Sequence, residues 1–467
     1  MRVLYIGAGF VGTCSAAVMA DSGHDVLVYD IDEGKIKMLA SYNRELIELC
    51  LFEKGLGELL VTNKERIKFT ANYDEVIKFL DEVDVIFMCL PTPEKKDARG
   101  ESDISYIVQA TEKLAEHLSK RNNGTQEKYV VIANKSTVPI KMVDEVERIM
   151  TNFGVKNFGV VSNPEFLVEG KAIENSIRPD RIVVGAKKEQ DFEVMRNLYR
   201  RFYDSPTTTY IETNPYEAAA GKLMANFLLF NRLVTTYGVV GRLCEIFPEI
   251  SFENLRKIIT TDKRIGSWGF YNSLYAGGSC LIKDAASLDF QLEKAGIDVR
   301  QIKQVLAMNQ HQRDYFYSRA KKEANFSWEG KCVAVMGVAF KRDTNDIRNS
   351  AAIDIVRYLV DDGAKEIRLY DPAATVPFKR LFDINKDERY EKIVYCNRED
   401  EALKGSNACI IVTDWPQFRS LGEKIKVFCP PPYLIMDGRR MIQHYYDELV
   451  KDGYSIIAVG SPYLTKS

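Results

Sequence analysis

The octapeptide Gly277-Gly278-Ser279-Cys280-Leu281-Ile282-Lys283-Asp284 combines residue types that suit covalent chemistry at a thiol. Its two glycines let the backbone approach a ligand closely. A lysine near Cys280 can lower the pKa of the thiol, which makes it a better nucleophile. If a helix begins near Cys280, the spacing of four puts the thiol and the Asp284 carboxylate on one face. The alternative is a small buried cysteine at a glycine-rich helix start, which composition alone favours.

Two other segments carry polar pairs with a spacing of four. Asn163–Gly170 follows a strand-like run and contains Glu165 and Glu169. Loops at the carboxyl edge of a parallel sheet bind ligands, although acids also suit a plain helix start. Lys222 and Asn226 lie in a long apolar helical stretch. The lysine is unusual for pure packing, and its alternative role is a side chain that reaches out to solvent.

A glycine-rich turn near the N-terminus predicts a dinucleotide site. Gly7-Ala8-Gly9-Phe10-Val11-Gly12 follows the first strand-like run and opens an alanine-rich helix. We expect Gly7, Gly9, Phe10, Val11 and Gly12 to bind a pyrophosphate through backbone N–H groups and the helix dipole. Asp30 ends the second strand 18 residues past Gly12, and its carboxylate favours NAD over NADP. Lys35 can reach the same ribose region or remain a solvated lysine.

The elements that position these residues alternate in the first 212 residues. Amphipathic stretches at 107–118 and 141–150 lie between short apolar runs. This alternation predicts a parallel, doubly wound sheet. The predicted buried strands are Val3–Ile6, Val26–Tyr29, Asp84–Leu90, Tyr129–Ala133, Phe158–Val161 and Ile182–Val184.

The remainder of the chain predicts a helical middle and a second α/β domain. Residues 213–326 are helical in pattern from Tyr216 to Leu243 and from Ser287 to Ala324. The charged segment 383–400 is expected to be a surface connection, and Pro430–Pro432 a loop. The fold class is therefore α/β, with two Rossmann-like parallel-sheet domains, 1–212 and 327–467, joined by a central helical domain with a long helix. The strands predicted after Trp328 are Lys331–Met336, Glu366–Tyr370, Ala408–Thr413, Tyr433–Met436 and Ser455–Val459.

Composition excludes several classes of function. The 467 residues predict about three domains. With 64 Lys and Arg against 66 Asp and Glu, the chain lacks the basic surplus of a nucleic-acid binder. Nine cysteines without a CxxC pair and four scattered histidines predict neither a disulfide framework nor a metal site. Without a secretory signal or a run of about 18 apolar residues, we expect a cytoplasmic protein that does not bind membranes.

The chain resembles the UDP-glucose/GDP-mannose dehydrogenase family from Gly7 to about Gly460. This resemblance rests on many motifs in the same order along the chain, not on one of them. Besides Gly7–Gly12, Asn163–Gly170, Lys222 with Asn226 and Gly277–Asp284, the matching motifs are Pro91–Pro93, Lys135–Pro139, Pro179–Arg181, Asp262–Gly266, Gly337–Lys341, Thr344–Arg348, Thr413–Trp415 and Asp437–Arg439.

The resemblance implies a four-electron oxidation of a nucleotide-sugar C6 alcohol to a carboxylate with two NAD. Cys280 would trap the aldehyde as a thiohemiacetal and then hold a thioester. Lys222 would stabilise the alkoxide and oxyanion, and Asn226 would hold a water or the oxyanion by hydrogen bonding. Asp284 and Glu165 would activate or relay the hydrolytic water. The same water network would be bound by Thr137.

The resemblance also implies contacts to both ligands. Cations at the nucleotide-sugar site suit a diphosphate, although Arg440 adjoins Arg439 and either can reach the ligand. The implied further cofactor contacts are Thr92, Ser136, Thr137, Glu169, Lys283 and Arg348. The implied substrate contacts are Glu165, Phe166, Leu167, Lys222, Asn226, Arg264, Tyr271, Ser273, Gly277, Phe340, Lys341 and Arg439.

The sequence leaves the substrate open. In the segment Phe270–Ala276, Tyr275 stands where the family has glycine and Ala276 where it has an aromatic residue. UDP-glucose is the leading substrate, with a UDP-N-acetylhexosamine or GDP-mannose as alternatives. A non-catalytic regulatory module would be indicated by loss of Cys280, Lys222 or Asp284, and all three are present. The long central helix, and Arg264 reaching a neighbouring subunit, imply a homodimer or a higher homo-oligomer.

Overall fold

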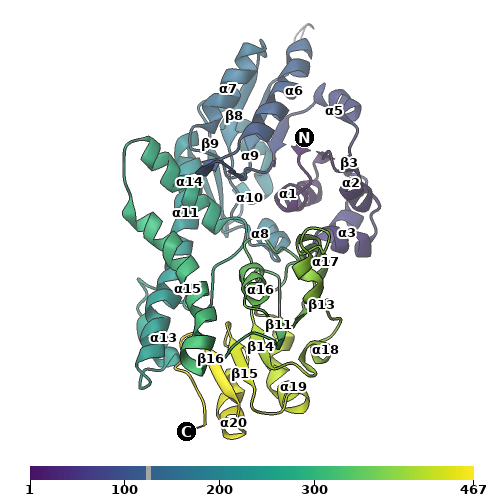
Figure 1. The fold of residues 1–467 in the computed structure, drawn as a ribbon. Coiled ribbons are helices and arrows are strands. Elements are labelled where there is room, and N and C mark those ends of the chain that lie inside the picture. The colour runs from purple at the N-terminus through teal and green to yellow at the C-terminus, as the bar shows by residue number, and fades with distance from the viewer. Residues whose placement is uncertain (122–127, 467) are drawn as a thin grey trace. The chain divides into compact units, whose positions relative to one another are not determined.

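The computed structural model describes residues 1–121 and 128–466, and its contacts divide the chain into two compact units (Figure 1). Unit 1 comprises Met1–Ala225 and Ser287–Ile297, and unit 2 comprises Asn226–Ala286 and Asp298–Ser467. The boundary passes through two helices, α11 (Pro215–Thr235) and α14 (Leu281–Lys294). The three-domain division of the sequence stays a prediction.

Unit 1 is built on one eight-stranded sheet. Its order is β10-β9-β8-β7-β4-β1-β2-β3, and six of its seven pairings are parallel. A two-stranded hairpin, β5 (Glu94–Lys95) with β6 (Ala98–Ser102), stands apart from it. The strands of the sheet are β1 (Arg2–Ile6), β2 (Asp25–Tyr29), β3 (Ile67–Thr70), β4 (Val85–Met88), β7 (Val130–Asn134), β8 (Phe158–Ser162), β9 (Arg181–Gly185) and β10 (Thr209–Thr213).

The doubly wound sheet is confirmed, but the prediction that it is parallel throughout is wrong at one pairing. β8 and β9 meet antiparallel, with Ser162 opposite Gly185. The connection between these strands, residues 163–180, contains one short helix, α8 (Ala172–Ile177). β3 and β10 lay outside the predicted strands because polar residues interrupt their apolar ones.

Helices cover both faces of this sheet. Val3 and Tyr5 of β1 pack in one apolar cluster with α1 and α8, whereas Leu4 and Ile6 pack in another with α6 and α7. This alternation follows from the two-residue period of a strand. α6 and α7 lie side by side (Figure 1). The helices are α1 (Phe10–Asp21), α2 (Glu33–Ala40), α3 (Arg44–Cys50), α4 (Leu56–Thr62), α5 (Tyr73–Leu80), α6 (Ser105–Arg121), α7 (Met142–Asn152), α8, α9 (Glu189–Leu198) and α10 (Arg200–Tyr203).

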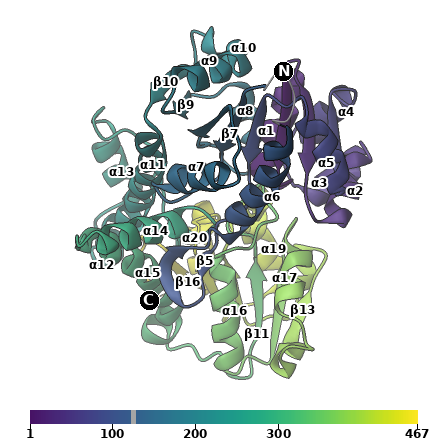
Figure 2. The ribbon, with the colours of Figure 1, turned by 90° about the horizontal axis from the view of Figure 1, so that it is seen from above.

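Unit 2 contains a six-stranded sheet with the order β13-β12-β11-β14-β15-β16, parallel at every pairing. Its strands β11 and β13 appear with α16 and α17 at the bottom of Figure 2. The strands are β11 (Cys332–Met336), β12 (Glu366–Tyr370), β13 (Ile393–Tyr395), β14 (Ala408–Ile411), β15 (Leu434–Asp437) and β16 (Ser455–Ala458). The helices are α16 (Ala351–Asp361), α17 (Thr375–Leu381), α18 (Glu399–Leu403), α19 (Leu421–Phe428) and α20 (Tyr446–Lys451).

The five strands predicted after Trp328 are confirmed, and the expectation for residues 383–400 is partly wrong. β13 lies within that charged segment and pairs with β12. β13 is the apolar run Ile393–Tyr395, which is short and lies among charged residues, so it was not predicted as a strand.

Helices fill the middle of the chain, as predicted. α11 continues through a π-helical turn (Thr236–Val240) into α12 (Gly241–Ile246), and α13 (Phe252–Thr260) follows. The second predicted helical stretch is two helices, α14 and α15 (Arg300–Ala324). Gly296, with a φ of +80°, lies in the break between them, where a left-handed residue ends a helix.

By length and composition alone, the helical run Pro215–Ile246 is apolar enough to cross a membrane. Polar residues interrupt this run, so the sequence contains no uninterrupted stretch of about 18 apolar residues there. Two polar residues in this run, Lys222 and Asn226, are buried and bonded to other parts of the protein. A core helix passes the same test of length and composition, and buried polar residues with protein partners suit that role.

Candidate active site

The glycine-rich turn between β1 and α1 forms a cradle that fits a dinucleotide pyrophosphate. Gly7 has a φ of +107°, which suits glycine, and a Cβ on Gly12 would lie 2.0 Å from the Gly7 carbonyl oxygen. A Cβ on Gly9 would meet nothing within 4 Å, and Gly9 gives α1 no side-chain cap. The N-terminus of α1 therefore opens onto free space, where backbone N–H groups and the helix dipole favour an anion.

Asp30, at the end of β2, is held against this turn. Its Oδ2 accepts the Ala8 N–H at 2.7 Å and the Lys35 ammonium at 3.1 Å. The carboxylate is therefore placed where a ribose hydroxyl can reach it and where a 2′-phosphate would be repelled. Lys35 is near the predicted ribose region, as expected, but is paired with Asp30. The turn and Asp30 together fit NAD.

Two neighbouring strand ends carry further residues predicted to contact the cofactor. The Thr92 hydroxyl, after β4, donates to the Thr137 carbonyl at 2.8 Å, after β7. The Ser136 hydroxyl donates to the Leu90 carbonyl at 2.7 Å. β4 lies next to β1 in the sheet, so these loops are at the same carboxyl edge as the glycine-rich turn. Glu169 lies in the loop after β8, and the predicted Lys283 and Arg348 belong to unit 2.

The loop Asn163–Gly170 contains no helix, so the helix-start alternative for its two acids is wrong. Glu165 Oε2 accepts the Leu167 N–H at 2.5 Å, and its Oε1 accepts the Lys222 ammonium at 3.2 Å. The Lys222 ammonium also lies 5.2 Å from the centre of the Phe166 ring. The lysine side chain is only 5% exposed, so the alternative in which it reaches solvent is also wrong.

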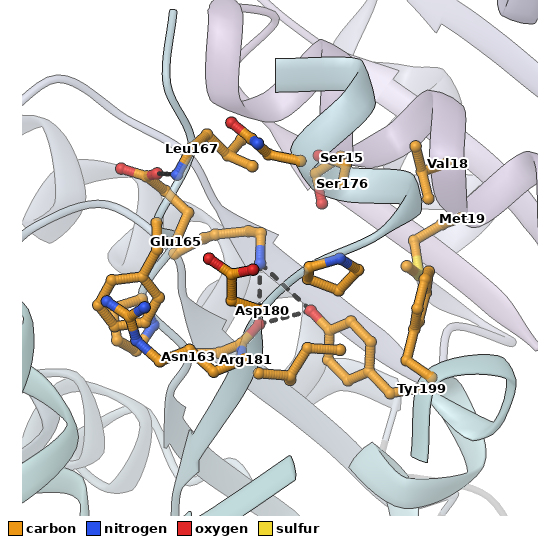
Figure 3. Close-up of a pocket in the computed structure, with 17 residues that line it drawn as sticks. Ser15, Val18, Met19, Asn163, Glu165, Leu167, Ser176, Asp180, Arg181 and Tyr199 are labelled. Carbon is orange, nitrogen blue, oxygen red and sulfur yellow. Dashed lines mark hydrogen bonds between the residues drawn. The ribbon is translucent and has the colours of Figure 1, made fainter. Parts of the chain in front are cut away.

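A pocket beside this loop contains a buried lysine to which sequence reasoning gave no role (Figure 3). Lys135 donates to Asn163 Oδ1 at 3.0 Å and to the Tyr199 hydroxyl at 3.2 Å. The Tyr199 hydroxyl donates to the same Asn163 oxygen at 2.6 Å. Burial lowers the pKa of Lys135 to about 8. An asparagine and a lysine directly after four apolar strand residues are the signal that could have identified this site.

Glu53 is a second residue that the sequence did not single out. It is buried, and its carboxylate accepts the Gly170 N–H at 2.9 Å and the Ile173 N–H at 3.2 Å. These bonds tie the end of the loop to the start of α8. Glu53 is 117 residues from Gly170 in the sequence, and no local pattern links the two.

In unit 2, Cys280 directly precedes α14, and it is the one exposed thiol among the described residues. Its carbonyl accepts the Asp284 N–H at 2.8 Å, so a helix does begin there, as predicted. The alternative of a buried packing cysteine therefore does not hold. Elsewhere, burial raises the pKa of Cys89 to about 12 and that of Cys50 and Cys396 to about 11.

Asp284 is fully buried, and its carboxylate accepts hydrogen bonds from one amide and one ammonium group. Asn226 Nδ2 donates to its Oδ2 at 2.6 Å, and the Lys283 ammonium donates to its Oδ1 at 2.7 Å. Lys222, one helical turn before Asn226 on α11, belongs to the predicted set as well. The structure thus joins Asn226, Lys283 and Asp284 in unit 2 and Lys222 with Glu165 in unit 1.

The two glycines before the cysteine have a different role from the one expected. A Cβ on Gly277 would lie 2.3 Å from the Asn349 carbonyl oxygen, and one on Gly278 would lie 2.8 Å from the Phe340 ring. The expectation was close approach of a ligand, whereas the segment from Phe340 to Asn349 occupies that space. The glycines are needed for packing of the protein on itself.

Arg439 and Arg440 point to different parts of unit 2. The Arg439 guanidinium donates to the carbonyls of Val412 at 2.8 Å and Phe340 at 3.0 Å. Arg440 donates to the carbonyls of Val459 and Gly460. Arg439 is therefore the arginine beside the predicted substrate residues Phe340 and Lys341.

Of three other predicted substrate residues, two are exposed to solvent and one is buried. Arg264 is exposed and paired with Asp262, and Tyr271 is half exposed. Ser273 is buried, and its hydroxyl donates to the Tyr275 carbonyl at 2.8 Å. Arg348, predicted to contact the cofactor, is exposed and paired with Asp346. The hydroxyl of Ser273 is thus engaged within its own loop.

Unit 2 repeats the geometry of the glycine-rich turn with one difference. Gly337, after β11, has a φ of +89°, and Asp371 follows β12 as Asp30 follows β2. Asp371 Oδ2 accepts the N–H groups of Val338 and Ala339 and the Trp415 indole N–H. Its Oδ1 accepts the next two N–H groups, from Ala373 and Ala374. Asp371 thus accepts five N–H donors, whereas Asp30 accepts three donors: the Ala8 and Asp32 N–H groups and the Lys35 ammonium.

Comparison with known proteins gives the family. Three domain models of the UDP-glucose/GDP-mannose dehydrogenase family match: the NAD binding domain at residues 1–203, the central domain at 216–311 and the UDP binding domain at 334–444. The chain belongs to this family. It is accordingly a nucleotide-sugar dehydrogenase with an NAD-binding domain, and the resemblance seen in the sequence is confirmed.

Individual relatives of the family match over nearly their full length. A UDP-glucose 6-dehydrogenase of Rhizobium meliloti (strain 1021) is 32% identical, over 99% of this chain and all of the relative. That of Gallus gallus is 31% identical, over 98% of this chain and 93% of the relative. A UDP-glucose dehydrogenase structure from Pyrobaculum islandicum matches with a TM-score of 0.82 at 26% identity, over 95% of each chain. A UDP-D-ManNAc dehydrogenase from Pyrococcus horikoshii, at 24% identity and a TM-score of 0.79 over 98% of this chain and 99% of that one, shares the fold.

Proposed function

We propose that this enzyme oxidises UDP-glucose at C6 to UDP-glucuronate and reduces two NAD in the process. The observation that carries the proposal is Cys280, an exposed thiol at the start of α14, four residues before the buried Asp284. Relatives that are 31–32% identical over nearly the whole chain are named UDP-glucose 6-dehydrogenase, which supports the choice of substrate.

NAD, when bound, accepts a hydride in each of the two oxidations. In the first, the C6 alcohol loses a hydride and a proton and becomes an aldehyde. The Cys280 sulfur then adds to the aldehyde carbon, and the thiohemiacetal so formed loses a second hydride and a proton to become a thioester. Water displaces the thiol, releasing a carboxylate and restoring Cys280. Each step balances without a further oxidant.

Lys222 and Asn226 are proposed to stabilise the negative oxygen that develops at C6 in these steps. An ammonium held in a buried site acts on such a charge more strongly than it would in water. The pairing of Lys222 with Glu165 supports this role because it holds the ammonium at a fixed position in the site.

Asp284 and Glu165 are proposed to activate the water that hydrolyses the thioester, with Thr137 binding that water. Both carboxylates are oriented by hydrogen bonds, Asp284 by Asn226 and Glu165 by Leu167. A positioned carboxylate can take the proton of an attacking water.

The diphosphate of the substrate is proposed to bind to Arg439, Lys341 and Arg264, and the sugar to the loop residues predicted from the sequence. The match of residues 334–444 to the family's UDP binding domain supports the first two assignments. Arginine and lysine suit phosphate oxygens because they offer charged donors. Arg264 is exposed, which suits a contribution to the site of a second subunit.

The same chemistry on another nucleotide sugar, a UDP-N-acetylhexosamine or GDP-mannose, is the second candidate. It is favoured by the segment Phe270–Ala276, in which Tyr275 and Ala276 depart from the family pattern. A third candidate is a binding module without turnover. The presence of Cys280, Lys222 and Asp284 argues against that one.

We also propose that the enzyme is a cytoplasmic homodimer or higher homo-oligomer. Several large apolar side chains of the helical run Pro215–Ile246 are exposed in the single chain, and a second copy of the chain would cover them. Those at least one third exposed are Met224, Leu228, Leu229, Val239, Leu243 and Ile246.

The test is NADH formation with a panel of nucleotide sugars. The proposal expects UDP-glucose to give the highest kcat/KM and two NADH for each sugar consumed. A higher kcat/KM for a UDP-N-acetylhexosamine or GDP-mannose would transfer the proposal to that substrate. One NADH per sugar with release of free aldehyde would exclude the covalent mechanism, and binding without NADH would indicate the non-catalytic module.

A further inference from the structure

One buried side chain, outside every motif considered so far, binds both backbone groups of a single residue ahead of the cysteine. Asn309 lies on α15 and is only 1% exposed. Its Oδ1 accepts the Ala276 N–H at 2.9 Å, and its Nδ2 donates to the Ala276 carbonyl at 3.0 Å. Such a pair of bonds fixes a residue of irregular backbone much as a neighbouring strand would.

Tyr237 fixes the orientation of that amide. Its buried hydroxyl donates to Asn309 Oδ1, which thus accepts two hydrogen bonds. Tyr237 lies in the π-helical turn of the long apolar helix, and such turns are rare and frequent at functional sites. A Cβ on the next residue, Gly238, would lie 2.7 Å from the Met308 sulfur. The glycine lets α15 and the π-helical turn approach closely at this level.

The chain between Ala276 and Cys280 is held from the other side as well. The Gly278 N–H donates to the Arg348 carbonyl, and Asn349 Nδ2 donates to the Gly278 carbonyl, both at 3.0 Å. Beyond the turn, the Cys280 carbonyl is fixed by the first turn of α14. Asn309 therefore supplies the upstream anchor of a short turn whose middle and end are anchored elsewhere.

The chemistry of this anchor requires a side-chain amide. An amide offers an acceptor and a donor in one plane, which match the N–H and carbonyl of Ala276. An ionised aspartate of the same shape would still accept the N–H but would set a negative oxygen against the Ala276 carbonyl. Asn309→Asp therefore removes the hydrogen bond to the Ala276 carbonyl and puts electrostatic repulsion in its place, while the volume of the side chain stays the same.

We propose that Asn309 is a positioning residue for the thiol: by fixing the backbone of Ala276, it sets the conformation of the turn that presents Cys280. Asn309 does not itself contact the reacting atoms. The inference rests on the role of Cys280 in the proposed function. Its effect is therefore expected on the steps that need the sulfur, and not on the binding of the nucleotide diphosphate.

The experiment compares the wild-type enzyme with Asn309→Asp and Tyr237→Phe. We expect Asn309→Asp to lower kcat about tenfold or more, with KM for UDP-glucose changed less than about threefold. Brief alkylation with iodoacetamide, followed by mass spectrometry of the Cys280 peptide, should show an altered rate. Hydrogen exchange should increase at residues 276–280 at a temperature where the variant is folded. Tyr237→Phe should change the same quantities in the same direction, but less.

Gln312 provides the matched control. It lies three residues further along α15, is also 1% exposed, and its Oε1 has no hydrogen-bond partner within the part of the chain that the structure describes. Gln312→Met should leave kcat and the alkylation of Cys280 at wild-type values in the folded enzyme. It thereby measures what a buried polar substitution on this helix does by itself.

Wild-type kcat, alkylation and exchange in folded Asn309→Asp would overturn the proposal, as would a loss of kcat no larger than that in Gln312→Met. If Asn309→Asp does not fold, unchanged alkylation and kcat in Tyr237→Phe would overturn it. If the wild-type enzyme oxidises no nucleotide sugar, the proposed function fails. Alkylation and exchange in Asn309→Asp then still decide whether Asn309 sets the conformation of the turn.

Discussion

The Asn226 amide donates to the Asp284 carboxylate at 2.6 Å, and both side chains are buried. The two residues come from different helices, α11 and α14, and are 58 residues apart in the sequence. A buried carboxylate costs free energy unless donors compensate it, and Asn226 and the Lys283 ammonium are the donors here. This arrangement fixes the orientation of a carboxylate that lies four residues, or about one helical turn, after Cys280 in the sequence.

Replacement of Asp284 should trap the covalent intermediate. Asp284→Asn keeps the shape of the side chain but removes its ability to take a proton from water. We expect turnover to fall about a hundredfold. Mass spectrometry of enzyme quenched during turnover should show a sugar-nucleotide adduct on the Cys280 peptide. Rapid turnover without an adduct would show that another group activates the water.

Replacement of the thiol should abolish overall turnover. Cys280→Ser replaces the sulfur with an oxygen that attacks the aldehyde less readily and forms an ester that hydrolyses more slowly. We expect a loss of about a thousandfold, or roughly 4 kcal/mol of barrier, in steady-state NADH production. Cys409→Ser, at a fully buried thiol of β14, is the control and should cost stability but little activity. Comparable activity in the two variants would argue against a covalent role for Cys280.

Asp30 should determine the choice between NAD and NADP. Asp30→Ala removes the acceptor for a ribose hydroxyl and for the Ala8 N–H, so the Michaelis constant for NAD should rise about tenfold. The same change should narrow the preference for NAD over NADP. Initial rates with both cofactors test this, and Asp32→Ala, which removes only the cap of α2, is the control. A wild-type enzyme that uses both cofactors equally well would contradict the assignment.

Lys135 should give stability a characteristic dependence on pH. Burial lowers its pKa in the folded protein to about 8, below its usual value of 10.5, so the folded state loses this proton before the unfolded state does. Between these two values the unfolded state binds more protons, and the free energy of unfolding should rise with pH. Below pH 8 the full cost of burying the charge is present.

The test compares Lys135→Met with the wild type by denaturant unfolding between about pH 7 and pH 10. The contribution of other ionisable groups is common to both proteins, so the difference in the free energy of unfolding isolates Lys135. The variant should be relatively more stable at pH 7, and its advantage should shrink as the pH rises. A difference that does not change with pH would mean that the pKa of Lys135 is the same in the folded and the unfolded state.

The sequence predicted those features that depend on neighbours along the chain. Buried strands such as β1 and β14 are continuous apolar runs, and the glycine turn before α1 has its residues within one hexapeptide. β10 was missed because polar residues interrupt its apolar ones, and β13 because its apolar run has only three residues within a charged segment. The antiparallel pairing of β9 with β8 is not encoded in the periodicity of the strand itself.

The residues of the candidate site also divide into those with a local sequence signal and those without one. Cys280 and Asp284 were found because they are four residues apart at a helix start. Lys222 and Glu165 were also identified as candidates from the sequence. Their pairing joins positions 57 residues apart, so only the structure could show it. Glu53 and Asn309 gave no local signal, because each bonds to backbone groups brought near only by folding.

The aspartates at corresponding positions of the two sheets, Asp30 and Asp371, accept different numbers of hydrogen bonds. This difference affects the order of events in the proposed reaction. Asp30 accepts three donors and has capacity left for a ribose hydroxyl, whereas Asp371 accepts five N–H groups of its own domain. The carboxyl-terminal sheet therefore does not offer a second binding site for a dinucleotide. In the proposed reaction, both oxidations would then use the same NAD site. The first NADH would have to leave and a second NAD bind while the partly oxidised sugar stays on the enzyme. A covalent bond to the Cys280 sulfur would keep that sugar on the enzyme while NADH is replaced by NAD.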